Sequence, residues 1–241
     1  MNYIKWNSGI LPPPKFPATA YTSHTMSTSY YDPNEELELS TSGNLPHWNQ
    51  SGKIQFITFR LGDSLPKSRI TELNNLRATF LANNPQPWNM ATTQEYWKLT
   101  GPVESRLLDN GYGSCIFKNQ EIRAILSDCL QYLNGKDYNL IAYVIMPNHV
   151  HLLIKTYEIG KKLSAIMHSI KSFSANKINK LINNRSGSLW MKEYFDRIIR
   201  SETHLNSCIN YIISNPRLLN PGEYELFINP KYLRQDAASP R

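Results

Sequence analysis

The stretch VIMPNHVHLLIK, residues 144–155, carries two histidines that are separated by a single residue in an otherwise apolar run. Side chains of a β-strand alternate between the two faces of a sheet, so His149 and His151 point to the same side. The opposite side takes the aliphatic residues Val150, Leu152 and Ile154. This pattern predicts a strand with a hydrophobic core on one face and two imidazoles aimed at a common point on the other.

The composition indicates one ordinary globular domain. The chain has 241 residues, of which 41% are hydrophobic, and this is enough for a real core. No stretch approaches the roughly 20 apolar residues of a membrane span, and the N-terminus has no apolar signal segment. The scattered cysteines Cys115, Cys129 and Cys208 form no CxxC pair, which suits a reducing compartment. We therefore expect a cytoplasmic protein without a membrane partner.

Positive charge is concentrated directly after the histidine strand. The chain has a formal net charge of +7, and residues 155–200 hold ten Lys or Arg against three acidic residues, whereas the first fifty residues hold two lysines and four acids. A solvated helix face would explain such a cluster. A track for a polyanion would explain it as well, and its position beside the histidines favours this interpretation.

The periodicity predicts an α+β fold with a largely antiparallel sheet. Residues 1–47, rich in Pro, Ser, Thr and Tyr, lack periodicity and indicate an extended arm. Strands 138–146 and 149–155 are joined too tightly at Pro147 and Asn148 for a parallel crossover. Strand character is also expected at 53–61 and 194–199, and helices are expected at 64–81, 93–108, 119–133, 162–182 and 201–215.

The last predicted helix offers partners for the histidines. Tyr211 and Asn215 lie four residues apart and therefore share a helix face, one turn above the other. Two neutral imidazoles with an amide oxygen suit Mg²⁺ or Mn²⁺ better than a closed zinc site. A bound ion would make a phosphodiester more susceptible to attack by a phenol.

Ordinary alternatives exist for each of these residues. An H-x-H strand is often an exposed polar face, a helical tyrosine often only packs, and Asn215 before Pro216 is a common helix end. His204 is a spare ligand, and Tyr143 and Tyr194 compete with Tyr211 as candidate nucleophiles. Tyr194 lies in an extended basic stretch where stacking on a base is as natural as chemistry.

Three motifs in order resemble a known family. The sequences MPNHVHLL, SLWMKEYFDRIIR and YIISNP resemble the single-tyrosine HUH transposases, and among them the REP-associated tyrosine transposases. The resemblance covers about residues 48–221, which leaves the arm at 1–47 and a C-terminal tail at 222–241. It implies a ferredoxin-like or RRM-like antiparallel sheet with the histidines on a central strand. Members bind single-stranded DNA hairpins and cleave beside them, forming a 5′-phosphotyrosine and freeing a 3′-hydroxyl.

The resemblance also implies roles for individual residues. His149, His151 and Asn215 would bind the metal, although many relatives have glutamine at the last position, and Tyr211 would be the nucleophile. We expect phosphate contacts and base stacking from the residues Lys171, Lys177, Trp190, Tyr194, Arg197 and Arg200. The expected substrate is a REP-like hairpin, and the protein would be a monomer or a homodimer. Two rival hypotheses remain: a domesticated hairpin-binding protein that does not cleave, and a metal hydrolase that activates water.

Overall fold

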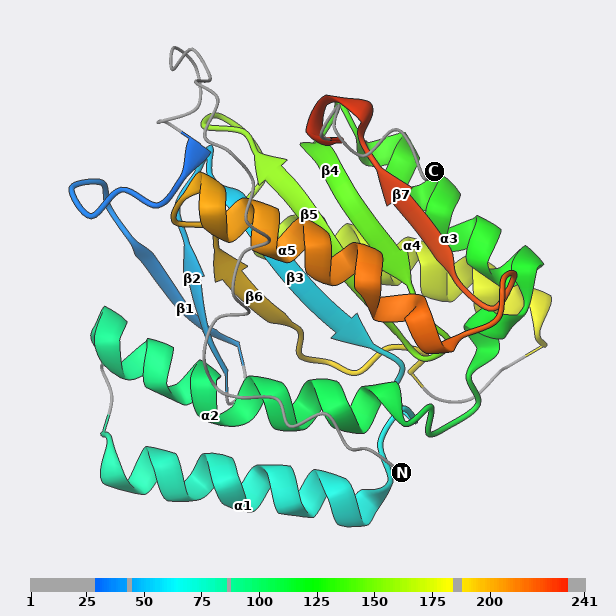
Figure 1. Cartoon of the computed structure of the whole chain (residues 1–241), viewed down its shortest axis with the longest axis horizontal. Coiled ribbons are helices and arrows are strands. Elements are labelled where there is room, and N and C mark those ends of the chain that lie inside the picture. Colours follow the sequence, from blue (N-terminus) through cyan, green and yellow to red (C-terminus); the bar gives the residue numbers. More distant parts are fainter. Residues whose placement is uncertain (1–28, 43–44, 86–87, 184–187, 234–241) are drawn as a thin grey trace, which may run out of the picture.

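The sheet and its helices are seen in a computed structural model, which describes residues 29–42, 45–85, 88–183 and 188–233. A five-stranded antiparallel sheet forms the centre, and helices cover both of its faces (Figure 1). The strand order is β6 (Phe195–Ile198), β3 (Ile54–Arg60), β5 (His149–Thr156), β4 (Tyr138–Ile145) and β7 (Glu225–Ile228). The predicted α+β class with an antiparallel sheet is confirmed. Within the described residues, no helix is long and apolar enough to cross a membrane.

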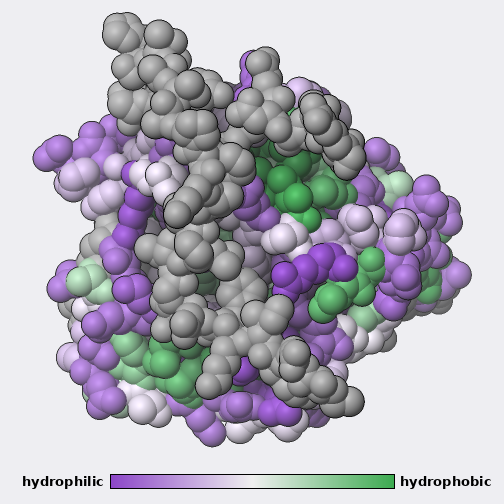
Figure 2. Space-filling model, viewed as in Figure 1, coloured by the Kyte–Doolittle hydropathy of each residue, from purple (hydrophilic) through white to green (hydrophobic). Residues whose placement is uncertain are grey.

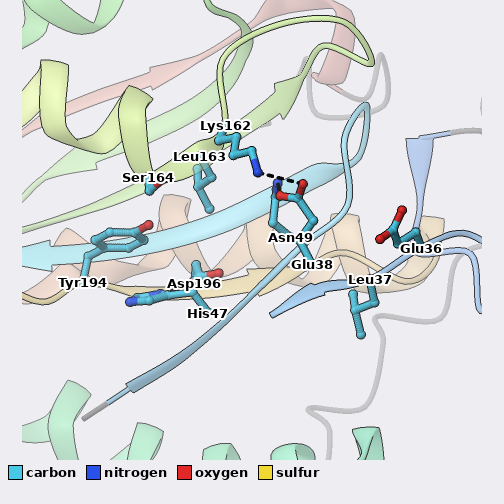
Figure 3. Close-up of a pocket in the computed structure, with 10 residues that line it drawn as sticks. All are labelled: Glu36, Leu37, Glu38, His47, Asn49, Lys162, Leu163, Ser164, Tyr194 and Asp196. Carbon is cyan, nitrogen blue, oxygen red and sulfur yellow. Dashed lines mark hydrogen bonds and ion pairs between the residues drawn. The ribbon is translucent and has the colours of Figure 1, made fainter. Parts of the chain in front are cut away.

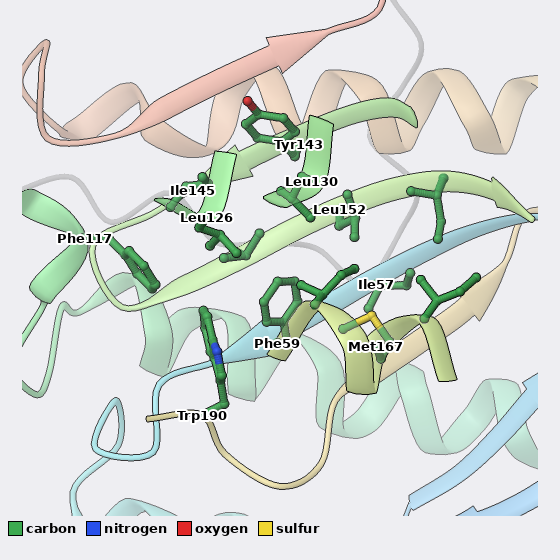
Figure 4. Close-up of a cluster of buried hydrophobic side chains, with 14 of the residues drawn as sticks. Ile57, Phe59, Phe117, Leu126, Leu130, Tyr143, Ile145, Leu152, Met167 and Trp190 are labelled. Atoms are coloured by element: carbon green, nitrogen blue, oxygen red, sulfur yellow. The ribbon is translucent and has the colours of Figure 1, made fainter. Parts of the chain in front are cut away.

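One face of the sheet is a continuous hydrophobic core. Helices α3 (Gln120–Leu133) and α4 (Leu163–Leu181) pack on this face. Figure 4 shows how side chains from the strands and the two helices interlock there. The members include Ile57, Phe59, Phe117, Leu126, Leu130, Val150, Leu152, Ile154, Met167 and Trp190. Burial of such side chains, each worth about 1.5–3 kcal/mol, supplies the main driving force for this layer.

The other face is covered by α5 (Glu202–Ser214). Its buried stripe, Leu205, Cys208, Ile209 and Ile212, packs on Ile54, Phe56, Val144 and Leu153 of the sheet. The helix begins at Ser201, whose side chain accepts a hydrogen bond from the His204 backbone nitrogen. It ends at Ser214 and continues into the 3-10 helix η3 (Asn215–Leu218), in which Asn215 keeps helical backbone angles although Pro216 follows. This is the face that carries the histidines.

Helices α1 (Lys67–Asn83) and α2 (Met90–Asp109) form a helical hairpin between β3 and α3 in the chain. An aromatic cluster of Phe80, Trp88 and Tyr96 joins the two helices. Glu104 of α2 ties this hairpin to the sheet: its carboxylate pairs with Arg60 of β3 at 3.4 Å and with Arg77 of α1 at 2.9 Å. Trp97 of α2 also packs edge-on against a ring of β6, that of Phe195. The end of α2 is thereby held beside the histidine-bearing face.

Three strands lie wholly or partly in segments that we expected to be an arm and a tail. Strands β1 (Glu38–Ser42) and β2 (Leu45–Asn49) form an antiparallel hairpin within the expected arm, at the edge formed by β6. Strand β7, in the expected tail, pairs with β4 and becomes the outer strand of the sheet. β7 owes its pairing to an edge supplied by distant sequence, whereas β1 and β2 pair with each other in a separate two-stranded sheet. Residues 1–28 of the expected arm and 234–241 of the expected tail lie outside the described residues.

Candidate active site

His149 and His151 face each other on the central strand. Their Nε2 atoms are 3.2 Å apart, and each residue is 1% exposed. The register places Arg60 and Thr58 of β3 opposite the two histidines on one side. On the other side Val144 of β4 lies opposite His151. The expected convergence of the two rings is therefore present in the fold, in the layer between the sheet and α5.

A polar neighbour holds the Nδ1 atom of each ring. The Oδ1 atom of Asn148 lies 2.7 Å from His149 Nδ1, and the Oγ1 atom of Thr58 lies 2.8 Å from His151 Nδ1. Burial lowers the pKa of His149 to about 3 and brings the pKa of His151 well below its usual value, with the neighbouring His149 adding to the second effect. Both imidazoles are therefore neutral near pH 7, which is the form that binds a metal.

Tyr211 is carried to this pair by α5. Its hydroxyl oxygen lies 3.3 Å from His151 Nε2, and its ring makes edge contacts with His151 and Phe56. The position follows from the helix itself, because Tyr211 borders the stripe that packs on the sheet. Neither of the competing tyrosines reaches the histidines in this way: the Tyr143 hydroxyl contacts Ser127 and Glu225, and Tyr194 stacks on His47.

Burial raises the pKa of Tyr211 to about 12, which makes the phenol harder to deprotonate. Hydrogen bonds from the side chains of Ser105 and Asn215 and the charge of Arg197 act in the opposite direction, whereas Asp109 raises the value further. Ser105 and Asp109 belong to α2, so the helical hairpin contributes to the surroundings of the candidate nucleophile. These opposing effects leave the phenol protonated at neutral pH.

Asn215 presents an unsatisfied oxygen. Its Oδ1 atom is buried and lacks a hydrogen-bond partner among the described residues, while its side chain interacts with the Tyr211 hydroxyl. A buried acceptor without a donor is costly unless something else pairs with it. Two neutral imidazole nitrogens 3.2 Å apart and this amide oxygen form a donor set that fits a divalent ion with open positions for water. Within the described ranges, no cluster of three or more His, Cys, Asp or Glu forms an alternative metal site.

The predicted DNA contacts divide between the two faces of the sheet. Arg197 projects on the α5 face, where its guanidinium lies over Phe56 and Phe195 and influences Tyr211. Arg200 precedes α5, and its backbone nitrogen donates to His204 Nδ1 at 3.3 Å. Lys171 and Lys177 belong to α4 on the opposite face. Of these four residues, Arg197 is the one whose charge acts on the candidate nucleophile.

The two predicted stacking residues are already engaged. Trp190 is 3% exposed, packs against Phe59 and Phe117, and donates to Ser174 at 3.0 Å. Figure 4 shows its ring inside the core, where a base cannot reach it. This corrects the expectation that Trp190 stacks on a base, because its ring packs in the hydrophobic core. One face of Tyr194 is covered by the His47 ring at 4.4 Å.

Tyr194 lines a separate polar cavity of about 350 Å³ between the β1–β2 hairpin and the start of α4 (Figure 3). In it, His47 is hydrogen-bonded through Nδ1 to Asp196, and Lys162 pairs with Glu38 at 3.0 Å. Burial raises the pKa of Asp196, and the contact with His47 opposes this. The cavity shares no lining residue with the histidine and tyrosine site.

Sequence reasoning missed the residues that support the site. The sequence predicts for Asn148 only a place in the turn between the two strands, and its position directly before His149 is the signal that could have identified it. Thr58 shares the histidine-bearing face by strand alternation but needs a register before it can be paired with His151. Ser105 and Asp109 carry no sequence signal, because only the packing of α2 brings them to Tyr211.

Comparison with known proteins finds a family model that matches part of the chain. Residues 112–215 match the family model described as "Transposase IS200 like", a segment that includes the histidines, Tyr211 and Asn215. A solved structure described as "Structure of the REP associates tyrosine transposase bound to a REP hairpin" is similar with a TM-score of 0.40 and 14% sequence identity. The similarity covers 73% of this chain and 74% of that chain. No curated protein matches this sequence.

Proposed function

We propose that this protein nicks and rejoins single-stranded hairpin DNA through a covalent tyrosine intermediate, as the match of residues 112–215 to the IS200-like transposase family model suggests. The order of its three motifs favours the REP-associated type and hairpins of the REP-like class. We assign the domain to residues 48–221 and extend it to β7 (Glu225–Ile228), which pairs with β4 in the same sheet. The single observation that carries the proposal is the convergence of Tyr211 with the two histidines on one buried face.

His149, His151 and Asn215 are the residues that would hold Mg²⁺ or Mn²⁺. Their neutral nitrogens and the unpaired amide oxygen support this assignment. A divalent ion bound there would polarise the scissile phosphate and offset the negative charge that develops on it. Asn148 and Thr58 orient the imidazoles from behind.

The Tyr211 oxygen attacks the phosphorus of the scissile phosphodiester and forms a new P–O bond. The bond from phosphorus to the 3′ oxygen of the preceding nucleotide breaks. The phenol proton passes to water, and the departing oxygen takes up a proton, so the products are a 5′-phosphotyrosine and a free 3′-hydroxyl. Because the bond energy is kept in the phosphotyrosine, attack by a 3′-hydroxyl reverses the step and rejoins the strand.

Arg197 and Arg200 are the proposed phosphate contacts on the α5 face. Both lie at the junction of β6 and α5, and the charge of Arg197 reaches the Tyr211 phenol. Figure 2 shows the α5 side of the molecule, where hydrophilic residues separate several hydrophobic patches. Lys171 and Lys177 would contact only DNA that extends around to the α4 face.

The test is a denaturing gel with labelled hairpin strands, including palindromes that flank the gene. With Mg²⁺ or Mn²⁺ we expect label to migrate with the wild-type protein. EDTA and Tyr211→Phe should each abolish this adduct, and the Phe variant should bind the hairpin within about threefold of wild type. Tyr143→Phe is the matched control, because that hydroxyl contacts Ser127 and Glu225 away from the histidines. A Tyr211→Phe variant that still forms the adduct would contradict the nucleophile assignment.

One observation favours a second function, a hairpin-binding protein that does not cleave. The pKa of Tyr211 is raised to about 12, so the phenol is held in its less reactive form. This alternative predicts hairpin binding without adduct at any metal concentration. Cleavage without adduct, surviving in Tyr211→Phe, would instead identify a hydrolase that activates water.

A further inference from the structure

Asn148 occupies the turn between β4 and β5, directly before the first histidine, and is 1% exposed. Its side-chain nitrogen donates to the backbone oxygens of Leu108 at 3.2 Å and Tyr112 at 3.0 Å. Its Oδ1 atom lies 2.7 Å from His149 Nδ1. Both amide hydrogens and the amide oxygen are therefore in use, and the partners come from the exit of α2 and from the histidine.

The two carbonyl groups fix the orientation of this amide. A backbone carbonyl oxygen can only accept a hydrogen bond, so the amide nitrogen must face Leu108 and Tyr112. The amide oxygen must then face His149, and an oxygen acceptor requires a proton on Nδ1. His149 consequently keeps its lone pair on Nε2, the atom that faces His151 Nε2.

The second histidine differs in this respect. Its Nδ1 partner is the Thr58 hydroxyl, which can either donate or accept. His151 can therefore carry its proton on either nitrogen, and in the metal-free protein a proton on its Nε2 would satisfy the His149 lone pair across 3.2 Å. The contacts thus fix the tautomer of His149 and leave the tautomer of His151 free to change.

We propose that Asn148 is the positioning residue of the metal centre: held by the carbonyls of Leu108 and Tyr112, it presents the Nε2 lone pair of His149 to the ion. The inference rests on the proposed function, because it takes His149 as a ligand. It also gives the α1–α2 hairpin a part in the centre, since the exit of α2 supplies one of the carbonyls. Groups behind metal-binding histidines commonly fix the ring tautomer in this way.

The tautomer can be measured in the metal-free full-length chain by NMR of ¹⁵N-labelled histidine. We expect a proton on His149 Nδ1 in the wild type. Asn148→Leu should lose this preference, because leucine has no acceptor. Asn148→Asp should keep the preference, because a carboxylate accepts from Nδ1–H, although it cannot donate to the two carbonyls. If neither variant folds, the tautomer of the wild type alone still tests the inference.

Mn²⁺ titration by calorimetry supplies the second readout. Asn148→Leu should weaken Mn²⁺ binding about 10–100-fold, and Asn148→Asp, which keeps the acceptor for His149 but loses both contacts with the carbonyls, should weaken it less. Asn229→Leu is the matched control: its amide also bridges two backbone groups, Leu140 O and Lys231 N, but at the opposite end of β4. Its Mn²⁺ affinity should not change.

Two results would overturn the inference: a wild-type His149 protonated on Nε2, or an Asn148→Leu variant with unchanged Mn²⁺ affinity. Failure of the proposed function gives a different signature. If the wild type forms no DNA adduct while the tautomer and the Mn²⁺ affinities follow expectation, Asn148 keeps its role and the cleavage proposal fails.

Discussion

The two faces of β5 are equally buried, but one face forms hydrophobic core and the other carries the candidate site. On the α3 and α4 side, Val150, Leu152 and Ile154 lie in a continuous apolar core. On the α5 side, His149 and His151 are just as inaccessible but contact polar groups, namely Asn148, Thr58 and Tyr211. Burial stabilises the fold on the first face, whereas on the second it costs free energy and instead fixes neutral ligands and a nucleophile in place.

Paired substitutions at adjacent residues of β5 test this division. Leu152→Ala removes core volume and should lower the free energy of unfolding by about 2–5 kcal/mol. The folded fraction should bind Mn²⁺ as the wild type does. His151→Leu keeps a similar volume but leaves the polar atoms of Thr58, His149 and Tyr211 without this partner, so stability in EDTA should fall by about 1–3 kcal/mol. Its Mn²⁺ binding should be lost. Urea unfolding and calorimetry give the two quantities.

The opposite pattern would break the comparison. A His151→Leu variant destabilised as strongly as Leu152→Ala would make the histidine face part of the structural core. Retained Mn²⁺ affinity in His151→Leu would place the ion elsewhere.

The same division predicts which basic residues matter for DNA. In a Tyr211→Phe background, Arg197→Ala should weaken hairpin binding about tenfold at 0.1 M salt. The slope of log affinity against log salt should fall by about 0.7, the value for one phosphate contact on single-stranded DNA. Lys177→Ala, on the opposite face, should change affinity less than twofold with an unchanged slope. Fluorescence anisotropy across a salt series measures both.

Equal losses for the two variants would show that DNA follows the α4 face as well. A larger loss for Lys177→Ala would move the binding surface away from Tyr211 and would separate the basic cluster from the candidate nucleophile altogether.

Local sequence was sufficient for the elements that bury a periodic face. The alternation around His149 and His151 gave both the strand and the direction of the two rings, and the spacing of Tyr211 and Asn215 placed them together on α5. These features depend only on the periods of strand and helix. The tight turn at Pro147 and Asn148 likewise determined that β4 and β5 are antiparallel.

Features created by long-range packing could not be obtained in this way. Trp190 looked like a base-stacking residue because its neighbours are basic, yet its ring fills a gap between Phe59 and Phe117. Lys171 and Lys177 follow the histidine strand in sequence, but α4 carries them to the other face. Asn148 gained its role from Leu108, forty residues away. Each case depends on which layer a segment joins, and periodicity carries no information about that.

The α5 face also carries a third histidine, the half-buried His204, whose protonation should make the stability of the protein depend on pH. Burial, with Arg197 and Arg200 nearby, lowers the pKa of His204 to about 4. Because the unfolded value is about 6.5, the unfolded chain binds a proton first as pH falls. The contribution of the neutral His204 to the free energy of unfolding is therefore fully present above pH 6.5 and is lost as the pH falls toward 4. Between pH 7 and 4.5, His204→Gln should lose about 1 kcal/mol less than wild type, or 2–4 °C in Tm.

Thermal unfolding in EDTA at the two pH values measures this, and the contribution of the other histidines cancels in the difference between variant and wild type. His168→Gln is the control, since that residue lies exposed on α4. An equal acid loss in His204→Gln and wild type would mean that the arginine-rich junction of β6 and α5 tolerates a protonated imidazole. That junction would then hold an additional positive charge below pH 6, and hairpin affinity should rise there with His204 present and stay level without it.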